Sequence, residues 1–535
     1  MSRTLKPLNR SIRFSTILHP FRCMNFRATI RSAITSYGGV VSAMITGLLT
    51  IRLATHHLSK EEFGLWNFTM QTVGYFMMLE LGMTGSGTRL LGEPLARNDQ
   101  TRMNSWFTLS VIALSAQALL IVGIGMAAKS HIFSWFGIPE DLVGEASRLW
   151  TAFLLIQATA MLFKLSFAIL YAQNRVYWTN LMQTAGLWIT FGVFALMLKM
   201  GSGVTAYAWA AGASSLLVSV GGIWAVLRGG HRFRFTLRDA RPGELGRMFR
   251  FSGSLFFAGM AAQVYAASQG LVATKVLGLE AAAVLAVTTR SAILASQFVW
   301  RPFDAFSPRW QIAFCNGNRP AVAREFGLMT RLTLLLSAGA ALGLVFFNLP
   351  FVKLWTKPEY FGGTILTALT ALFLIVQGIN RCYAACFVLS MHLRAYIWTT
   401  FASVGVGILL MVEFTKLWGL AGIPAALLTT ELVYPLWFYV SKGGGLLLDA
   451  AFSPLVADFL FWFPPLILGC LASFLLADRW MEQLPLHLLL ASLAFLVLAA
   501  PIGIRCLTLF RLLKEPRSVV SGDTAAPPDT VSALG

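Results

Sequence analysis

Long apolar stretches separated by short polar segments recur along the whole chain. Each is about as long as the roughly 20 residues that a helix needs to cross about 30 Å of hydrocarbon. Runs such as Leu109–Ala128 do not alternate apolar with polar residues, which argues against membrane-spanning strands. The pattern predicts an all-α polytopic membrane protein with about fourteen transmembrane helices. Their approximate bounds are 32–54, 63–87, 105–127, 147–171, 177–198, 203–227, 251–272, 281–303, 328–349, 361–389, 392–414, 418–440, 456–477 and 486–505.

Two parts of the chain repeat the same landmarks about 220 residues apart. The run Leu53–Ala54–Thr55 near the end of the first predicted span reappears as Val272–Ala273–Thr274. The other matched landmarks are Trp135, Gln157, Trp178 and Thr179, which pair with Trp355, Gln377, Trp398 and Thr399. We therefore predict two six-helix repeats, at roughly 30–228 and 250–441, which form a two-lobed bundle. Such internal repeats are typical of secondary transporters, whose substrate site lies where the repeats meet.

The same pattern sets the expected domain order. A basic cytoplasmic segment, 1–29, precedes an N-lobe, 30–228, and an arginine-rich cytoplasmic linker, 229–250, joins it to a C-lobe, 251–441. Two further spans within 442–510 have no counterpart in the repeat, and the tail 511–535 has the composition of a disordered segment.

Composition supports a membrane protein, because 56% of the residues are hydrophobic and only 12% are charged. The net charge of +19 would suggest nucleic acid as a partner of a soluble protein. Here, however, most of the 42 lysines and arginines fall on the side of the membrane where the N-terminus is placed. This asymmetry predicts that both termini lie in the cytoplasm, and we expect no nucleic-acid partner.

The sequence gives no sign of a metal, a cofactor or a catalytic centre. Cys382 and Cys386 lie one helical turn apart, but no histidine pair with ligand spacing accompanies them, so we read them as packing residues. The longest outer loops, around 130–145 and 349–361, are short and contain no cluster of acids or histidines. We therefore expect a protein that is not an enzyme.

The stretch Ile51–Asp99 carries a resemblance to a known family. A short outer loop with an acidic pair and Phe63–Gly64 leads into a second span that ends in Glu80, Leu81–Gly82 and a later Arg89. Together with Tyr171–Ala172–Gln173–Asn174, Gly203 and Gly419, this pattern resembles the Wzx-type oligosaccharide flippases, which are polysaccharide-biosynthesis membrane proteins. The resemblance covers about 30–510.

The resemblance implies the fold of the multidrug, oligosaccharidyl-lipid and polysaccharide (MOP) exporter superfamily, with two six-helix bundles around a central cavity and alternating access. It also implies a bacterial inner-membrane location and a substrate, an oligosaccharide linked to undecaprenyl diphosphate. Glycan polymerase or assembly proteins are the implied partners besides the bilayer. Glu80 and Arg89 are carried over as matches to the family pattern, without an assigned role.

Ionisable residues inside predicted spans are expensive in lipid, so they usually face a cavity or a partner. Arg290 lies nearest the midplane of its span, whereas Lys164 and Arg381 lie at similar depth in the two repeats and Arg301 lies near a cytoplasmic end. A cationic pocket made by these four residues would suit a lipid diphosphate headgroup. The alternative is that each cation pairs with Glu80, Glu413 or Glu431, or extends to the interface.

Other polar residues are candidates for the cavity or for coupling. Glu80 and Glu431 could bind the proton or sodium ion that powers transport, and Gln157 and Gln377 occupy repeat-equivalent positions from which they could line the cavity. The tryptophans Trp66, Trp135, Trp355 and Trp418 are expected in the aromatic belt at the outer interface.

The function expected from these observations is flipping of a polyprenyl-diphosphate-linked oligosaccharide from the cytoplasmic to the outer leaflet, for surface polysaccharide biosynthesis. One alternative is a cation-coupled multidrug exporter of the same superfamily, which the intramembrane cations disfavour. Another is a membrane-embedded glycan transferase or ligase, which the short outer loops disfavour. A scaffold in a glycan-assembly complex, without transport, also stays open.

Overall fold

The computed structural model describes residues 26–77, 91, 94–95, 97–173, 175–229, 233–239, 242–315, 319–390, 392–443, 464–465, 467–469, 471 and 484–514. These residues are almost entirely helical, with no strand among them, so the all-α prediction is confirmed. Ten stretches within the described residues are long and apolar enough to cross a membrane, and one of them, 393–443, covers two predicted spans. The chain is thus a multi-pass membrane protein. The total of about fourteen spans stays a prediction, since most of the span expected at 456–477 lies outside the described residues.

The helices fall into two sets along the chain. The first set consists of α1 (Phe26–His57), α2 (Lys60–Met77), α4 (Gln100–Phe136), α5 (Glu140–Ala172), α6 (Val176–Lys199) and α7 (Ala206–Leu227). The second consists of α8 (Pro242–Leu277), α9 (Leu279–Thr288), α10 (Arg290–Cys315), α11 (Arg319–Trp355), α12 (Thr364–Leu389), α13 (Leu393–Trp418), α14 (Gly422–Val433), α15 (Pro435–Phe438) and α18 (Leu484–Lys514).

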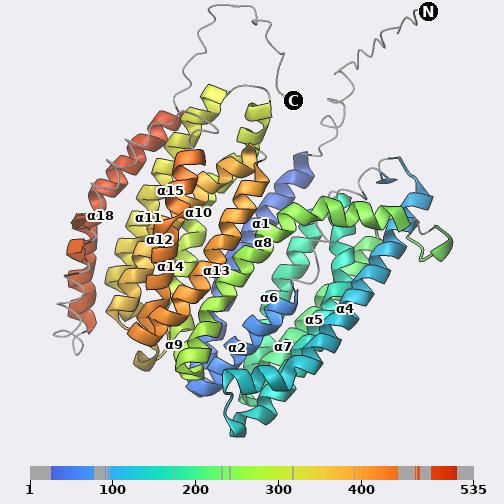
Figure 1. Cartoon of the computed structure of the whole chain (residues 1–535), viewed down its shortest axis with the longest axis horizontal. Coiled ribbons are helices and arrows are strands. Elements are labelled where there is room, and N and C mark those ends of the chain that lie inside the picture. The colour runs from blue at the N-terminus through green and yellow to red at the C-terminus, as the bar shows by residue number, and fades with distance from the viewer. Residues whose placement is uncertain are drawn as a thin grey trace, which may run out of the picture.

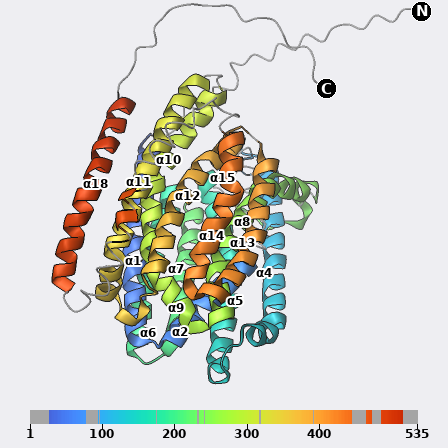
Figure 2. The ribbon, with the colours of Figure 1, turned by 60° about the vertical axis from the view of Figure 1, so that its left-hand side comes forward.

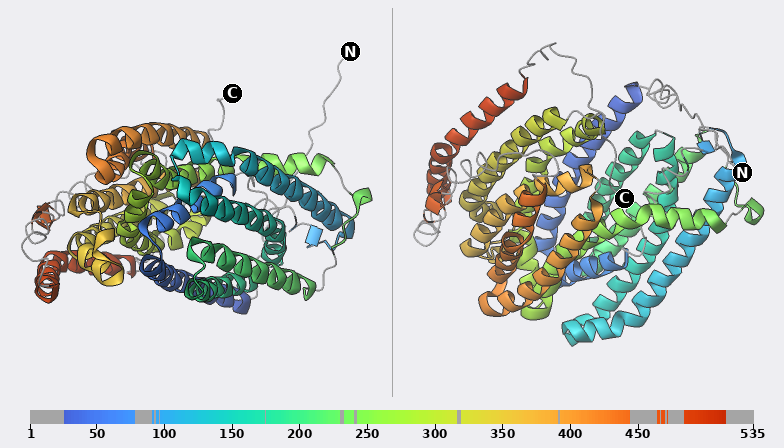
Figure 3. Two further views of the ribbon diagram at one scale, coloured as in Figure 1. Left: turned by 90° about the horizontal axis from the view of Figure 1, so that it is seen from below. Right: turned by 45° about the horizontal axis from the view of Figure 1, so that its top comes forward.

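The two sets form two groups of helices that lie side by side (Figure 1; Figure 2). Helices α1 to α7 make the first group and α8 to α15 with α18 make the second, and α1, α2, α8 and α9 lie where the two groups meet (Figure 1). Helix α1 packs on α6, and α8 packs on α13, which is the pair expected from a spacing of about 220 residues. Helix α18 packs on α11 at the outer edge of the second group, and Figure 3 shows the same arrangement from below.

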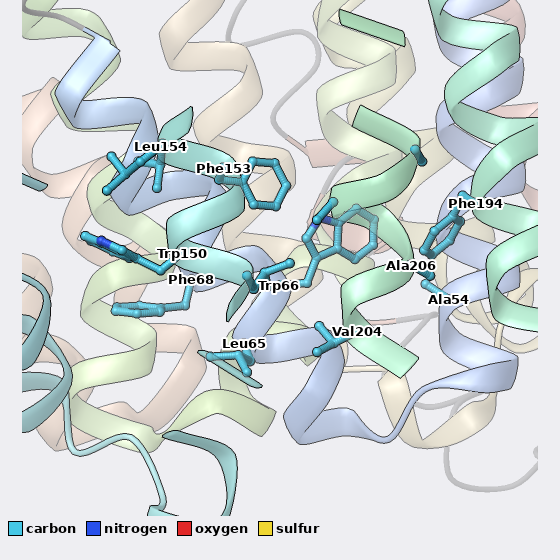
Figure 4. Close-up of a cluster of buried hydrophobic side chains, with 14 of the residues drawn as sticks. Ala54, Leu65, Trp66, Phe68, Trp150, Phe153, Leu154, Phe194, Val204 and Ala206 are labelled. Atoms are coloured by element: carbon cyan, nitrogen blue, oxygen red, sulfur yellow. The ribbon is translucent and has the colours of Figure 1, made fainter. Parts of the chain in front are cut away.

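The largest buried cluster lies mainly in the first group and is rich in aromatic residues (Figure 4). Trp66 of α2 lies with its ring 4.4 Å from that of Tyr207 and 5.7 Å from that of Phe194. Trp66 and Trp355 are both only 7% exposed, so their predicted place in an outer aromatic belt is wrong. The position of a tryptophan in a predicted span indicates how deep it lies in the membrane. It does not indicate whether the side chain faces lipid or the protein interior. Trp135 and Trp418, at 63% and 57%, are exposed.

The connection expected as an outer loop around 130–145 is shorter than predicted. Helix α4 continues to Phe136 and α5 begins at Glu140. Gly137 ends α4 in a left-handed conformation, with φ of 68°, and its backbone N–H donates to the carbonyl oxygens of Phe133 and Ser134. A residue with a side chain is strained at this φ, so the glycine allows a three-residue turn between two long helices.

Three further helix boundaries differ from the sequence-based expectation. Helix α8 begins at Pro242, inside the segment expected as a linker, because proline is well suited to the first position of a helix. The span expected at 281–303 is interrupted at Thr289, between α9 and α10. The span expected at 418–440 is broken at Tyr434, since a residue before proline is disfavoured in helical conformation and Pro435 follows.

Candidate functional site

The two helix groups are joined by hydrogen bonds at one end of the bundle. The indole N–H of Trp355 donates to the carbonyl of Leu48 at 2.9 Å, and Arg52 donates to the carbonyl of Leu354 at 3.3 Å. The ammonium of Lys275 donates to the carbonyl of Trp135 and lies 5.2 Å from the centre of its indole ring. Apart from Leu48, which lies further along α1 toward its middle, these residues lie near the C-terminal ends of α1, α4, α8 and α11, so these bonds join the groups at that end.

The two helix groups also approach each other closely at glycine residues. Helices α2 and α9 meet at Gly64, where a Cβ would stand 2.1 Å from the carbonyl oxygen of Leu279. Deeper in the bundle, the Tyr75 hydroxyl lies 2.7 Å from the Ser268 hydroxyl and donates to the carbonyl of Val264 at 3.0 Å. Helix α8 also approaches α2 at Gly270, where a Cβ would meet the side-chain amide of Gln71.

Arg290 is the first residue of α10, directly after the interruption at Thr289. Its guanidinium reaches from the second group to α1 of the first group, where a Cβ on Gly47 would stand 2.6 Å from Nη2. It is also within electrostatic range of the Tyr207 phenol on α7. Its buried Nε has no hydrogen-bond partner among the described residues. Arg290 is therefore a cation held between the two helix groups.

A buried asparagine supports the interruption that positions Arg290. Asn348 of α11 is 3% exposed, and its amide N–H groups donate to the carbonyl of Thr288 and to the hydroxyl of Thr367, each at 3.1 Å. The Ser291 hydroxyl donates to the amide oxygen of Asn348. An unpaired backbone carbonyl costs free energy in a membrane interior, because lipid chains offer no hydrogen-bond donor. The bond from Asn348 to the Thr288 carbonyl therefore stabilises the interruption between α9 and α10.

Each helix group contains a cavity of its own. The first, of about 280 Å³, lies between α2, α5, α6 and α7 and is lined by Gln157, Lys164 and Tyr207 together with several serines. The second, of about 400 Å³, is lined by residues of α8, α10, α12, α13 and α14, including Gln377, Arg381 and Glu431. The structure therefore brings Gln157 together with Lys164, and Gln377 together with Arg381 and Glu431.

The two cavities correspond in part through the 220-residue repeat. Seven residues that line the first cavity have partners about 220 positions later that line the second. The pairs are Phe153 and Phe373, Gln157 and Gln377, Ala160 and Asn380, Lys164 and Ala384, Ala211 and Glu431, Ser215 and Pro435, and Ser219 and Tyr439. The polar groups differ, however: the first cavity has a lysine where the second has alanine, and the second has Asn380 and Glu431 where the first has alanines.

Glu431 is held by Asn380 within the second cavity. The Asn380 amide N–H donates to the Glu431 carboxylate and, at 3.4 Å, to the Glu431 backbone carbonyl. Asn380 is 4% exposed, and the hydroxyls of Tyr265, Tyr396 and Tyr439 line the same cavity. This arrangement offers oxygen ligands to a small cation or a proton. Among the described residues, no three side chains of the His, Cys, Asp or Glu type lie close enough to hold a metal by themselves.

The pairing of Arg381 differs from the sequence-based alternatives. Its guanidinium lies 2.9 Å from a carboxylate oxygen of Asp304 and stacks 4.8 Å from the centre of the Trp300 ring. Of the expected partners, Glu413 pairs with Lys416 at 2.8 Å on the surface and Glu431 faces Asn380, whereas Glu80 lies outside the described residues. Asp304 was missed because it lies one residue beyond the predicted end of its span.

The remaining predicted residues lie elsewhere. Arg301 is exposed and lines neither of these cavities. Glu80 and Arg89 fall outside the described residues. Cys382 and Cys386 are buried, unpaired thiols, which agrees with their reading as packing residues. Sequence reasoning also missed Asn348 and Asn380, although each is an asparagine inside an apolar run, a signal that could have identified them.

The chain was compared with protein families and with curated proteins. Residues 30–309 match the family described as polysaccharide biosynthesis protein. No curated protein matches the chain by sequence.

Three solved structures share the fold, all at low sequence identity. A lipid II flippase MurJ in an inward closed conformation aligns with a TM-score of 0.66 at 15% identity, covering 90% of this chain and 100% of its own. An inward-facing MATE family multidrug resistance transporter of the MOP superfamily aligns with a TM-score of 0.65 at 14% identity, covering 78% and 98%. A MOP superfamily transporter from Pyrococcus furiosus, described as having a binding pocket of reverse polarity, aligns at 0.55 and 17% identity, covering 78% and 96%.

Proposed function

This chain belongs to the polysaccharide biosynthesis protein family, and from that premise we propose that it flips an oligosaccharide linked to a polyprenyl diphosphate, of the undecaprenyl type, across the bacterial inner membrane. The proposed direction is from the cytoplasmic to the outer leaflet. Shared fold with a lipid II flippase and with transporters of the MOP superfamily supports a transporter rather than an enzyme. Glycan polymerase or assembly proteins are the proposed partners in the membrane.

The observation that carries the proposal is the position of Arg290. Its guanidinium lies between the two helix groups, and its Nε has no partner among the described residues. A guanidinium binds phosphate oxygens through two parallel hydrogen bonds, and a diphosphate offers several such oxygens. Lys164 in the first cavity supplies a second cation. Arg381 is paired with Asp304, which balances its charge, so we give it no headgroup-binding role of its own.

The contact between the helix groups supports alternating access. With the N-terminus in the cytoplasm, the end that carries the Trp355 and Arg52 hydrogen bonds is the outer end. Gly47 lies ten residues before the end of α1 at His57, which places Arg290 about 15 Å from that end, near the middle of a bilayer about 30 Å thick. We therefore assign the structure to a state closed to the outside.

The test of the proposal uses the full chain in cells that lack the native gene. Arg290→Ala should abolish surface glycan while the complete lipid-linked oligosaccharide accumulates in the cytoplasmic leaflet. Arg290→Lys should restore part of the activity because it keeps the charge but not the bidentate geometry. Arg301→Ala is the matched control, since Arg301 is exposed and outside both cavities. Normal glycan in cells that carry Arg290→Ala, with folded protein in the membrane, would refute this site.

A second candidate function rests on Glu431 and Asn380. A half-buried carboxylate in an internal cavity could couple transport to a cation, and it would also suit a cation-coupled multidrug exporter. A drug-susceptibility panel separates the two functions. Strong hypersensitivity on deletion, with normal glycan, would favour the exporter.

A further inference from the structure

A third, larger hollow lies outside the two cavities that correspond by the repeat. It measures about 790 Å³, which is within the range of about 300–1,000 Å³ typical of small-molecule sites. Leu165, Ser166 and Ile169 of α5 are buried beneath it, and residues of α4 and α7 form its sides. The only polar side chain other than Arg234 among its lining residues is Ser166, whose hydroxyl is satisfied by the Phe163 carbonyl at 2.7 Å. This apolar hollow is called here the α4–α5–α7 groove.

One wall of the groove is built from the segment that connects the two helix groups. Phe233 lies with its ring 5.8 Å from that of Phe107 on α4. The backbone N–H of Arg234 donates to the side-chain oxygen of Asn104 at 3.0 Å, and that of Thr236 donates to the hydroxyl of Thr108 at 2.9 Å. The connecting segment is therefore fixed on α4 by two hydrogen bonds, and its residues Phe233 and Arg234 line the groove.

The mouth of the groove is cationic. The Arg234 side chain is exposed and lines the groove directly. Two more arginines lie near the end of α7 but are not among the lining residues: Arg228 stacks 4.0 Å from the Trp224 ring, and Arg175 donates to the carbonyl of Ala225 at 3.0 Å. Beside them, Leu227 is 76% exposed. Arginines and tryptophan next to exposed apolar side chains are typical of the membrane–water interface.

We propose that the α4–α5–α7 groove binds an anionic phospholipid of the membrane, with an acyl chain among the apolar side chains and the phosphate at Arg234. The apolar lining matches a hydrocarbon chain, and the exposed guanidinium of Arg234 matches a negative headgroup. The surrounding leaflet supplies this lipid at high concentration. A bound lipid holds Phe233 on Phe107 and so keeps the connecting segment on α4. The site is independent of the substrate site around Arg290.

The experiment measures lipids that stay bound to the purified full-length protein by native mass spectrometry, after titration with phosphatidylglycerol, phosphatidylcholine or a polyprenyl phosphate. The wild-type chain should retain phosphatidylglycerol in preference. Arg234→Gln should lower that retention by about fivefold, as expected for one cation at a membrane surface, and should leave phosphatidylcholine unchanged. Arg238→Gln, a neighbouring exposed arginine that does not line the groove, is the matched control.

A second variant tests the groove itself. Ile223→Trp places a bulky ring in the wall and should displace both lipids, whereas Val220→Trp, on an exposed position of the same helix outside the groove, should displace neither. Equal retention by Ile223→Trp and the wild type would overturn the proposal. So would retention of a polyprenyl phosphate in place of phosphatidylglycerol, which would assign the groove to the tail of the transported substrate.

Discussion

The guanidinium of Arg290 occupies the space that a side chain on Gly47 would need, since a Cβ there would stand 2.6 Å from Nη2. The two residues belong to different helix groups, so one glycine allows an arginine to reach across the contact. The atom in the way is the far end of a flexible side chain, so the arginine can move aside while the backbone stays in place.

Substitution of Gly47 should therefore affect transport more than folding. We expect Gly47→Val to displace the guanidinium and to reduce flipping by about tenfold or more, equivalent to about 1.4 kcal/mol in the barrier. The melting temperature in detergent should change little. Gly38→Val on the same helix is the control, because no atom lies within 4 Å of the added Cβ. Wild-type flipping by Gly47→Val in reconstituted vesicles would contradict the proposed role of Arg290.

Gly64 differs from Gly47, because a side chain added at Gly64 would meet backbone atoms of Leu279, which cannot move aside as the Arg290 side chain can. An alanine at this position would bring Cβ to 2.1 Å from the Leu279 carbonyl, so α2 and α9 must separate. Overpacking of this kind costs about 1–3 kcal/mol. We expect Gly64→Ala to lower the melting temperature and to open the contact between the groups, as measured by labelling of a cysteine placed there. Gly74→Ala, on the same helix with open space around it, should do neither.

Asn348 should be needed for the shape of the helix break. Asn348→Leu removes the donors to Thr288 and Thr367 and leaves a buried carbonyl unpaired, at an expected cost of about 1–3 kcal/mol. Arg290 then loses its fixed position, so flipping should fall together with stability. Chemical or thermal unfolding and a flipping assay on the same preparation test this prediction. Full stability in Asn348→Leu would mean that the break is maintained by the packing of α9 alone.

Glu431 should matter for coupling rather than for stability. Glu431→Gln keeps a side chain of the same size that can still accept a hydrogen bond from Asn380, but it removes the charge. We expect transport that no longer responds to an imposed proton or sodium gradient, with uncoupled exchange retained. Vesicles with and without the gradient provide the comparison. An undiminished gradient response would exclude Glu431 from coupling.

The Arg381–Asp304 pair should contribute little to stability. The two side chains are 44% and 45% exposed, and exposed ion pairs typically contribute about 0–1 kcal/mol. A double-mutant cycle with Arg381→Gln and Asp304→Asn measures the coupling between them. A coupling energy well above about 1 kcal/mol would show that lipid surrounds the pair.

The sequence predicted the helical membrane fold and the equivalent positions of Gln157 and Gln377 in the two repeats, because the length of apolar runs and a fixed spacing can be read directly from the residues. Arg290 was also identified, since a cation in an apolar run is conspicuous. The contacts of these residues were less predictable. Asp304 lies at the end of a span, where its neighbour depends on how α10 packs against α12. Gly47 carries no signal of its own, because glycine is common in membrane helices.

The buried cluster around Trp66 contains residues from both halves of the chain. It includes Leu279, Ala283 and Val287 of α9, and also Val352, Trp355 and Tyr360. Synthesis proceeds from the N-terminus, so α1 to α7 enter the bilayer before these partners exist. The buried cluster of the first half therefore stays incomplete in the membrane until Tyr360 has been synthesised. During that interval, insertion factors or neighbouring lipids have to cover its exposed surface.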